Sequence, residues 1–234
     1  RPHPTGGWPL SYAEFEPYLA RAEAMYQLRG GADALSPAPS RALPEAGEMS
    51  AVDRVITERL AANGLHPYHL HTAVKEIEGC KTCLGFKCPM PCKMDARSAG
   101  VEPALATGKA ALLHSADVTR LVGDGQSISH IELRLAGETH VLHAPVFALA
   151  GGAFGSPRLC LGSASEAFPA GVANASGLVG RGLMFHLNEM FAVWPGMKGG
   201  GPSKSVGFRD LLWHEGERLG MVQAMGIDAS YGEI

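Results

Sequence analysis

The chain has 234 residues, of which 46% are hydrophobic and 18% charged, and its formal net charge is −3. This composition excludes a disordered chain and a coiled coil, and the 20 basic and 23 acidic residues nearly cancel, so no basic surface for nucleic acid is expected. The 30 glycines predict many tight turns and an α/β or all-β protein. We therefore expect a small-molecule partner.

The two ends of the sequence predict that it is an internal piece of a longer chain. It begins with Arg1, has no leader of charged and then apolar residues, and shows no terminating element from Gly232 to Ile234. The longest uncharged stretches, such as His143 to Pro157, are broken by proline and glycine. They fall short of the roughly 18–20 apolar residues of a membrane-spanning helix, so no membrane span is expected.

The first predicted element is a helix over residues 12–28. Ser11 and Glu14 form a capping box at its start, and apolar residues follow at helical spacing. Pro17 removes one backbone donor, and Gly30-Gly31 is expected to stop the helix.

A proline-rich connection and a second helix follow. The stretch Leu35 to Gly47 carries three prolines and predicts a surface connection. Ser50 is then expected to cap a helix in which Asp53 supplies the acidic third position, and Asn63-Gly64 is expected to end it. The apolar face of that helix comprises Val52, Val55, Ile56 and Leu60.

An extended segment and a short helix are predicted next. Pro67 bars a helix from Leu65 to Val74, and alternation places His69 and His71 on one side, which indicates a strand. Ala104 to Leu113 is short and rich in alanine, which predicts a helix that packs closely.

A β-meander is predicted between residues 116 and 150. Short extended runs alternate there with the turn signals Gly123-Asp124-Gly125 and Ala136-Gly137-Glu138. The expected strands are Val118–Leu121, Ile128–Leu135, His140–His143 and Val146–Ala150.

The last of these runs leads into a glycine-rich turn. Gly151-Gly152 and Gly155 follow the apolar strand, and a helix is predicted to start near Pro157. Small residues there would let a ligand approach the backbone, and the helix N-terminus would offer N–H groups to an anion. Equally, these glycines could serve only close packing of helix on sheet, since they match the GxGxxG fingerprint weakly.

Four of the five cysteines gather between residues 80 and 92, with the spacing Cys80-x2-Cys83-x4-Cys88-x3-Cys92. This spacing leaves three interpretations open: structural disulfides, thiolates that bind zinc or an iron–sulfur cluster, or free thiols. The ten histidines form no ligand motif, and we assign them no metal role.

A set of ordered segments resembles the glucose-methanol-choline family of flavoprotein oxidoreductases, and together they cover about residues 7 to 190. The segments are Gly7–Tyr12 running on to Arg21-Ala22-Glu23, Cys88–Lys93 running on to Pro103–Leu105, Ala116–Leu121, Ala150–Leu159 and Gly177–His186. The last two of these resemble that family's second signature and the segment after it.

This resemblance implies an FAD-dependent enzyme that oxidises a CH–OH group of an alcohol or aldehyde by hydride transfer to the flavin. The implied fold is α/β, in an α+β mixture: part of a Rossmann-like FAD-binding domain with the β-meander, interwoven with part of a substrate domain. Residues 1–30 would adjoin the FAD domain, and 31–75 would form a connection and part of the substrate domain. Residues 76–165 would belong to the FAD-binding domain, and 166–234 would begin the substrate-binding domain.

The resemblance also implies which residues bind the cofactor. Carried over position by position, they are Val118, Ala150, Gly151 and Ser156. An active-site histidine takes the hydroxyl proton in this family, but none of the ten histidines here lies in a matching motif. The catalytic residue is therefore unknown. The GxGxxG loop is also missing, and the piece alone is expected to be inactive.

Some dehydrogenases of this family pass electrons to a cytochrome partner and hold an iron–sulfur cluster on closely spaced cysteines. The spacing of Cys83, Cys88 and Cys92 resembles theirs, which implies a possible cluster and an electron-transfer partner. From a different class, the alternative is a cysteine-stapled zinc-binding or scaffold module without catalysis.

Overall fold

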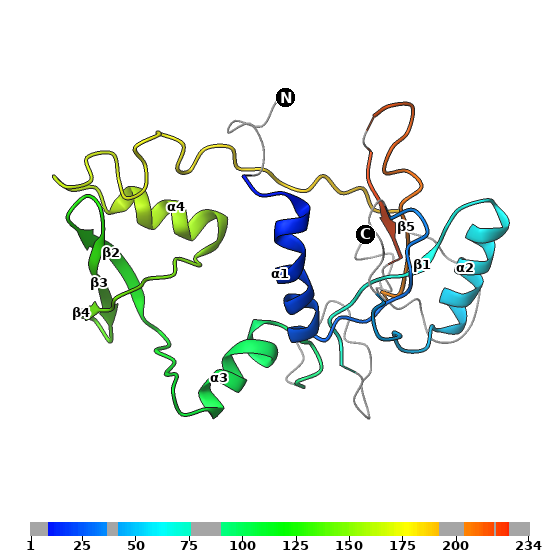
Figure 1. The fold of residues 1–234 in the computed structure, drawn as a ribbon, viewed down its shortest axis with the longest axis horizontal. Coiled ribbons are helices and arrows are strands. Elements are labelled where there is room, and N and C mark those ends of the chain that lie inside the picture. Colours follow the sequence, from blue (N-terminus) through cyan, green and yellow to red (C-terminus); the bar gives the residue numbers. More distant parts are fainter. Residues whose placement is uncertain (1–8, 37–41, 76–89, 192–203, 218, 225–234) are drawn as a thin grey trace, which may run out of the picture. The chain divides into compact units, whose positions relative to one another are not determined.

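The computed structural model describes residues 9–36, 42–75, 90–191, 204–217 and 219–224 (Figure 1). Within these residues the chain forms four α-helices, one π-helical turn and two three-stranded sheets. It divides into two compact units, one of Arg1–Ala110 with Ala192–Ile234 and one of Ala111–Phe191. Every strand pair in the described residues is antiparallel, so the fold is an α+β mixture and the Rossmann-like arrangement stays a prediction.

Helix α1, Tyr12–Met25, opens the first unit (Figure 1). The predicted capping box is confirmed: Glu14 N donates to Ser11 Oγ at 3.3 Å, and Ser11 N donates to Glu14 Oε2 at 2.8 Å. The helix ends three residues before its predicted end at 28, because Gln27 adopts a positive φ of 50° that a helix does not allow.

Helix α2, Ala51–Ala62, follows the predicted boundaries closely. Asp53 N donates to Ser50 Oγ at 3.1 Å, and Gly64 has the positive φ of 77° typical of a helix end. Val52 and Asp53 are buried on the side of α2 that contacts β5, Val206–Phe208.

The first unit has a small sheet in the order β1-β5-β6, where β1 is Tyr68–His69 and β6 is Val222–Gln223. The strand predicted from Leu65 to Val74 is therefore much shorter. The segment changes partners as it runs, because Leu70 N donates to Ser205 O while Thr72 N donates to Arg29 O. A long strand needs one continuous neighbour, and this segment has several.

The helix predicted from Ala104 to Leu113 is wrong in its boundaries. A π-helical turn, η1, Arg97–Val101, leads into α3, Glu102–Ala106, which stops before Gly108 with its φ of 70°. Proline lacks an N–H group and has a fixed φ, so Pro103 suits the first turn and favours the earlier start.

The second unit is built on the predicted meander, in the order β2-β3-β4 (Figure 1). Its strands are β2, Asp117–Gly123, β3, Ile128–Leu135, and β4, Glu138–His143. Ala136 and Gly137 both have positive φ, 52° and 88°, which makes the β3–β4 turn a two-residue turn with the twist that a hairpin prefers.

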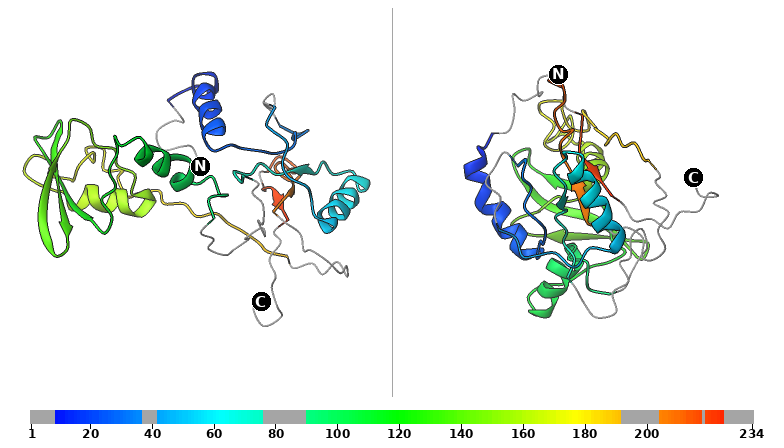
Figure 2. Two further views of the ribbon diagram at one scale, coloured as in Figure 1. Left: turned by 90° about the horizontal axis from the view of Figure 1, so that it is seen from below. Right: turned by 90° about the vertical axis from the view of Figure 1, so that its right-hand side faces the viewer.

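Helix α4, Gly152–Gly162, covers one face of this sheet, as the views in Figures 1 and 2 agree. The core between them contains Leu121, Cys160 and Val172, with five half-buried apolar residues packed around it. Ser163 joins helix and sheet: Leu121 N donates to its Oγ at 2.9 Å, and the Oγ donates to Leu159 O at 2.6 Å.

Two predictions at the start of α4 are wrong. The run Val146–Ala150 is not a strand, and the side chain of Val146 is 80% exposed, because within the described residues no strand lies beside it. The helix starts at Gly152 rather than near Pro157, because Gly155 N donates to Gly151 O at 3.1 Å and closes the first turn earlier.

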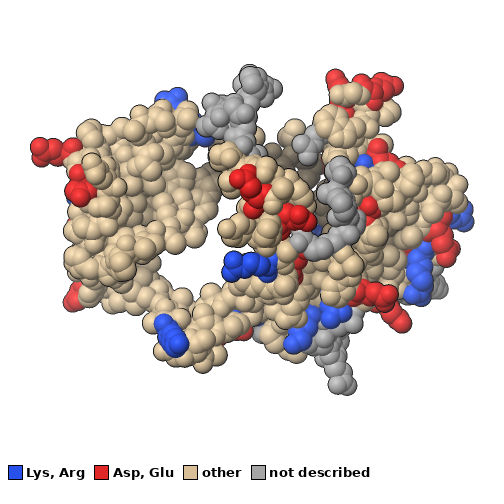
Figure 3. Space-filling model, viewed as in Figure 1, with Lys and Arg blue, Asp and Glu red and all other residues tan. Residues whose placement is uncertain are grey.

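The described helices include none that is both long and apolar enough to cross a bilayer. Lys and Arg side chains are interspersed with Asp and Glu on the face seen in Figure 3.

Candidate functional site

The predicted cofactor-binding residues all lie in the second unit, but in two places. Ala150 and Gly151 precede α4, and Ser156 lies in its second turn. Val118 lies on β2, where it is half-buried and pairs with Leu133. The structure therefore brings three of the four residues together at the start of α4.

The backbone at this turn favours glycine at two positions, at one through close packing and at the other through its conformation. A Cβ on Gly151 would lie 3.0 Å from Ser156 N and 3.3 Å from Ser156 Oγ, closer than side-chain carbons normally come. Gly152 has a φ of 72°, which other residues rarely adopt. The glycines predicted from the sequence are therefore needed for the turn itself, whatever else it binds.

The first turn of α4 is open to an anion. Its residues are exposed, no side chain caps it, and no acidic residue lies in it. The first N–H groups of any helix lack an intrahelical acceptor and carry the positive end of the helix dipole. This end of α4 can thus donate hydrogen bonds to a negatively charged group.

An open groove of about 500 Å³ adjoins this turn. One wall comes from α4 and the other from residues 180–184, so the structure brings together two segments that the resemblance singled out separately. The groove is lined by Ala153, Phe154, Pro157, Gly180, Arg181, Gly182, Leu183 and Met184.

Arg181 is a groove residue that sequence reasoning missed. It lies between Gly180 and Gly182, which have positive φ values of 77° and 74°, and it brings the one charged side chain among the groove residues. A charged residue between two glycines in a segment of apolar residues was the available signal. Its guanidinium adds a permanent positive charge to the lining of the groove.

Val118 does not line the groove. It lies three residues before Leu121, whose N–H bonds to Ser163 just beyond the last residue of α4. The ladder is irregular between Val118 and Arg120. The contact of Val118 with a cofactor stays a prediction.

The cysteine cluster falls largely outside the described residues, which hold neither Cys80, Cys83 nor Cys88. Cys92 is described and is 1% exposed, with its Sγ 4.0 Å from Met90 O. Among the described residues no group of three or more His, Cys, Asp or Glu is placed to hold a metal. The interpretations of the cluster therefore stay open.

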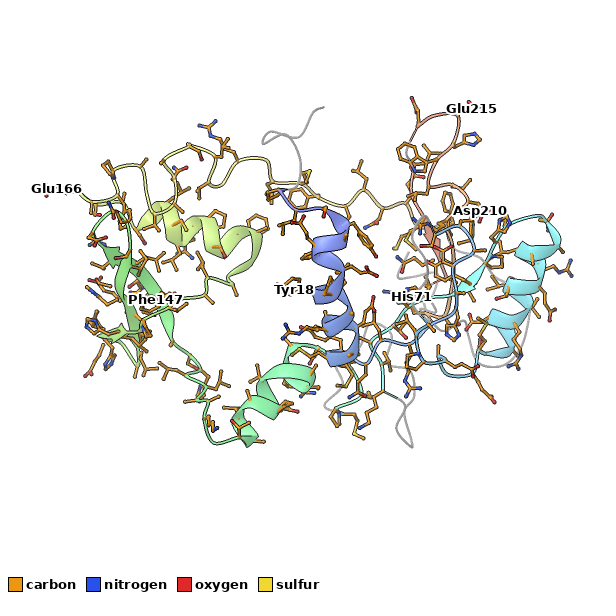
Figure 4. All side chains as sticks on the ribbon, in the orientation of Figure 1. Tyr18, His71, Phe147, Glu166, Asp210 and Glu215 are labelled. Atoms are coloured by element: carbon orange, nitrogen blue, oxygen red, sulfur yellow. The ribbon has the colours of Figure 1, made fainter. Side chains whose placement is uncertain are left out.

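Polar pairs in the first unit join segments far apart in the sequence. His66 N and its ring Nδ1 contact the Asp210 carboxylate at 3.2 and 2.7 Å, and Asp210 and His71 are labelled in Figure 4. Burial would raise the pKa of Asp210, but the hydrogen bonds from His66 outweigh it and lower that pKa. Burial lowers the pKa of His69, against the attraction of the Asp53 carboxylate.

None of these pairs matches a motif for hydride or proton transfer, and the sequence names no catalytic residue. They hold loops of the first unit in place. The arrangement with the clearest capacity to bind a ligand is the start of α4 with its groove.

The chain is similar in sequence to known oxidoreductases, although no family model matches it. It is 31% identical to paromamine 6'-oxidase of Streptomyces fradiae over 198 residues, which is 78% of this chain and 35% of that enzyme. It is 28% identical to the fructose dehydrogenase large subunit of Gluconobacter japonicus over 220 residues, 86% of this chain and 40% of that subunit.

A third relative, matched over a shorter stretch, is also an oxidoreductase by name. Over 70 residues the chain is 36% identical to 2-methyl-1,2-propanediol dehydrogenase of Mycolicibacterium austroafricanum, covering 30% of this chain and 12% of that enzyme. The chain thus spans 35% of the length of paromamine 6'-oxidase and 40% of the length of the fructose dehydrogenase large subunit. All three relatives are oxidoreductases by name.

Proposed function

We propose that this chain is part of an FAD-dependent oxidoreductase of the glucose-methanol-choline type, which oxidises a CH–OH group of a small alcohol or sugar. The relatives support the reaction class, because they are an oxidase and two dehydrogenases. The ordered sequence segments support the family. The observation that carries the proposal is the start of α4, where a glycine turn with open N–H groups adjoins a groove that Arg181 lines.

FAD fits this arrangement chemically, since its diphosphate is an anion that can take hydrogen bonds from helix N–H groups. When bound, FAD accepts the hydride from the substrate carbon. Gly151 and Gly152 place no side chain between the α4 N-terminus and the cofactor. Arg181 would place a positive charge beside that anion, and Ser156 and Ala150 would form the edge of the site.

We place residues 76–165 in the flavin domain and the stretch from 166 onward at the start of the substrate domain, as the resemblance implies. The backbone of Val118 would then contact the adenine end of the cofactor. In the second unit β2 contacts α4, so the two parts of this proposed site lie on elements that pack against each other.

The direct test is the flavin content of the purified full-length protein. We expect released FAD in near-stoichiometric amount and a strong loss of bound FAD in Gly151→Val, because the added side chain would collide with Ser156 N. Gly155→Ala is the matched control, since a Cβ there meets no atom within 4 Å. A folded full-length protein that neither contains nor takes up FAD would overturn the proposal.

An iron–sulfur cluster on Cys83, Cys88 and Cys92, with an electron-transfer partner, is a separate part of the proposal. It rests on the spacing of these cysteines. Iron and acid-labile sulfide measured on the same preparation test it. Flavin without iron or sulfide would remove the cluster and leave the flavin assignment standing, and zinc in place of both would favour the scaffold alternative.

A further inference from the structure

Two histidines face each other across the β3–β4 hairpin. His130 and His143 are register partners, and their ring centres lie 5.1 Å apart with the ring planes tilted by 42°. Because partners in a ladder point to the same side of the sheet, both rings belong to one face. No ligand motif in the sequence marks these two histidines, because their pairing depends on the hairpin register.

The register places this pair where side chains come closest. The turn has two residues, so Leu135 and Glu138 form the first hydrogen-bonded pair, and pairs alternate in kind from there. Five steps along, His130 and His143 form a pair of the non-hydrogen-bonded kind. In such pairs the Cα atoms lie about 4.5 Å apart, nearer than in the other kind.

The histidine face is the outer face of the sheet. Leu121 and Leu133 are buried on the opposite side, and Leu121 belongs to the core with α4. His143 is exposed and His130 is half-buried. An ion in solution can therefore reach both rings without any opening of the fold.

Ser129 lies beside one ring nitrogen of His130. Ser129 Oγ donates to Val122 O at 3.2 Å, and it lies 2.9 Å from His130 Nδ1. A hydroxyl has one hydrogen, so when it donates to Val122 O it accepts from His130, in the tautomer that carries the proton on Nδ1. In that tautomer the lone pair of Nε2 is available, as in metal sites where the second ring nitrogen donates to a neighbour.

We propose that His130 and His143 form a two-histidine site for a divalent first-row transition metal ion, with water completing the coordination. Imidazole favours Ni²⁺, Cu²⁺ and Zn²⁺ over Mg²⁺ and Ca²⁺. With a metal–nitrogen bond of about 2.0–2.1 Å, the ion lies about 3.2 Å from each ring centre, and an angle of about 90–109° at the metal separates the centres by about 4.5–5.2 Å. The observed 5.1 Å agrees with this spacing.

Water must complete the site, because in the part of the chain that the structure describes no third His, Cys, Asp or Glu joins such a group. The site is therefore exchangeable, unlike a closed structural zinc site. A bound ion would bridge β3 and β4 and stabilise the hairpin by mass action.

The test is Ni²⁺ binding to the full-length protein by calorimetry, with His130→Gln, His143→Gln, the double variant and His140→Gln. His140 is the matched control: it lies on β4 but pairs with Leu133, so it faces the other side of the sheet. The cysteines are the same in every variant, so any thiolate site contributes equally to all.

We expect either single substitution to weaken this site about a hundredfold, because the second ligand acts through its high effective concentration. The double variant keeps neither ligand and should also lose the weak binding that one histidine retains, and His140→Gln should bind as the wild type does. Unchanged binding in His143→Gln, or an equal loss in His140→Gln, would overturn the proposal. Since His143 is exposed, its substitution keeps the fold and the test decisive.

Discussion

At the scale of single residues, the conformation of a few glycines decides how α4 begins. Gly152 has a φ of 72°, and no atom lies within 4 Å of an added Cβ. A side chain there would therefore cause backbone strain but no steric clash. Gly155 has the same open surroundings and no positive φ. The two positions therefore separate backbone strain from packing.

We expect Gly152→Ala to lower the free energy of unfolding by about 1 kcal/mol, the cost of a left-handed conformation for alanine. Gly155→Ala, inside the helix, should raise it by about 0.5–1 kcal/mol through helix propensity. Urea unfolding of both variants measures the difference. Equal effects at the two positions would show that the positive φ of Gly152 is not maintained.

The thiol of Cys160 should resist modification in the native protein. Burial raises its pKa, and raised pKa values favour the neutral thiol rather than the reactive thiolate. Because the folded protein holds the thiol proton more tightly than the unfolded chain does, the neutral thiol contributes to stability. That contribution is fully present below the pKa of the unfolded chain and is lost as the pH rises through the pKa of the folded protein. We expect no alkylation of Cys160 by iodoacetamide at pH 7 without urea and complete alkylation in urea, as read by peptide mass spectrometry.

At the scale of elements, one hydroxyl connects helix to sheet. Ser163 is fully buried and contacts both Leu121 N and Leu159 O. Ser163→Ala leaves Leu121 N without its acceptor in the core. We expect a loss of about 1–3 kcal/mol in the free energy of unfolding, measured by urea titration, since an unsatisfied buried donor costs this much.

The matched control is Ser176→Ala. Ser176 is exposed and its hydroxyl accepts from Leu178 N at a long 3.4 Å, so its loss should be below about 0.5 kcal/mol. A similar loss in both variants would argue against a special role for the helix–sheet contact.

Elements with local signals were predictable from the sequence, and elements that need a distant partner were not. The Ser11 and Ser50 caps act within one turn of their helices, and the β3–β4 turn needs only Ala136 and Gly137. In contrast, the run Val146–Ala150 has strand-forming residues but no neighbouring strand among the described residues. A strand is defined by its partner, which local sequence does not specify.

The same reasoning applies to the candidate site. The glycines at 151 and 152 could be singled out because a tight turn needs them wherever it occurs. Arg181 could not, because its place beside α4 follows from how residues 180–184 pack. The His130–His143 pair likewise depends on the register of the hairpin.

At the scale of the whole molecule, an ion pair joins residues 176 positions apart in the sequence. Arg209 Nη1 lies 2.7 Å from Asp33 Oδ2, and the Asp33 side chain is 5% exposed. Arg209→Met should cost about 3 kcal/mol of unfolding free energy, because it leaves a buried carboxylate without its counter-charge.

The double variant Asp33→Asn/Arg209→Met is the control for this mechanism. It removes the charge yet keeps an oxygen for the hydrogen bond from Leu35 N. We expect it to be more stable than Arg209→Met alone, as denaturant titration of both proteins would show. If the double variant is the less stable protein, the isolated charge is not the cause of the loss.

We expect the two compact units to open independently of each other. Ser163 lies in the unit of Ala111–Phe191 and Arg209 lies in the other, and their hydrogen-bond partners belong to their own units. Local opening energies follow such cooperative units. Ser163→Ala should therefore speed amide hydrogen exchange within residues 111–191, while Arg209→Met should speed it in the first unit, as measured by mass spectrometry. If either substitution speeds exchange equally in both, the chain opens as one cooperative unit, and the effects of the two substitutions on stability would then report on a single transition.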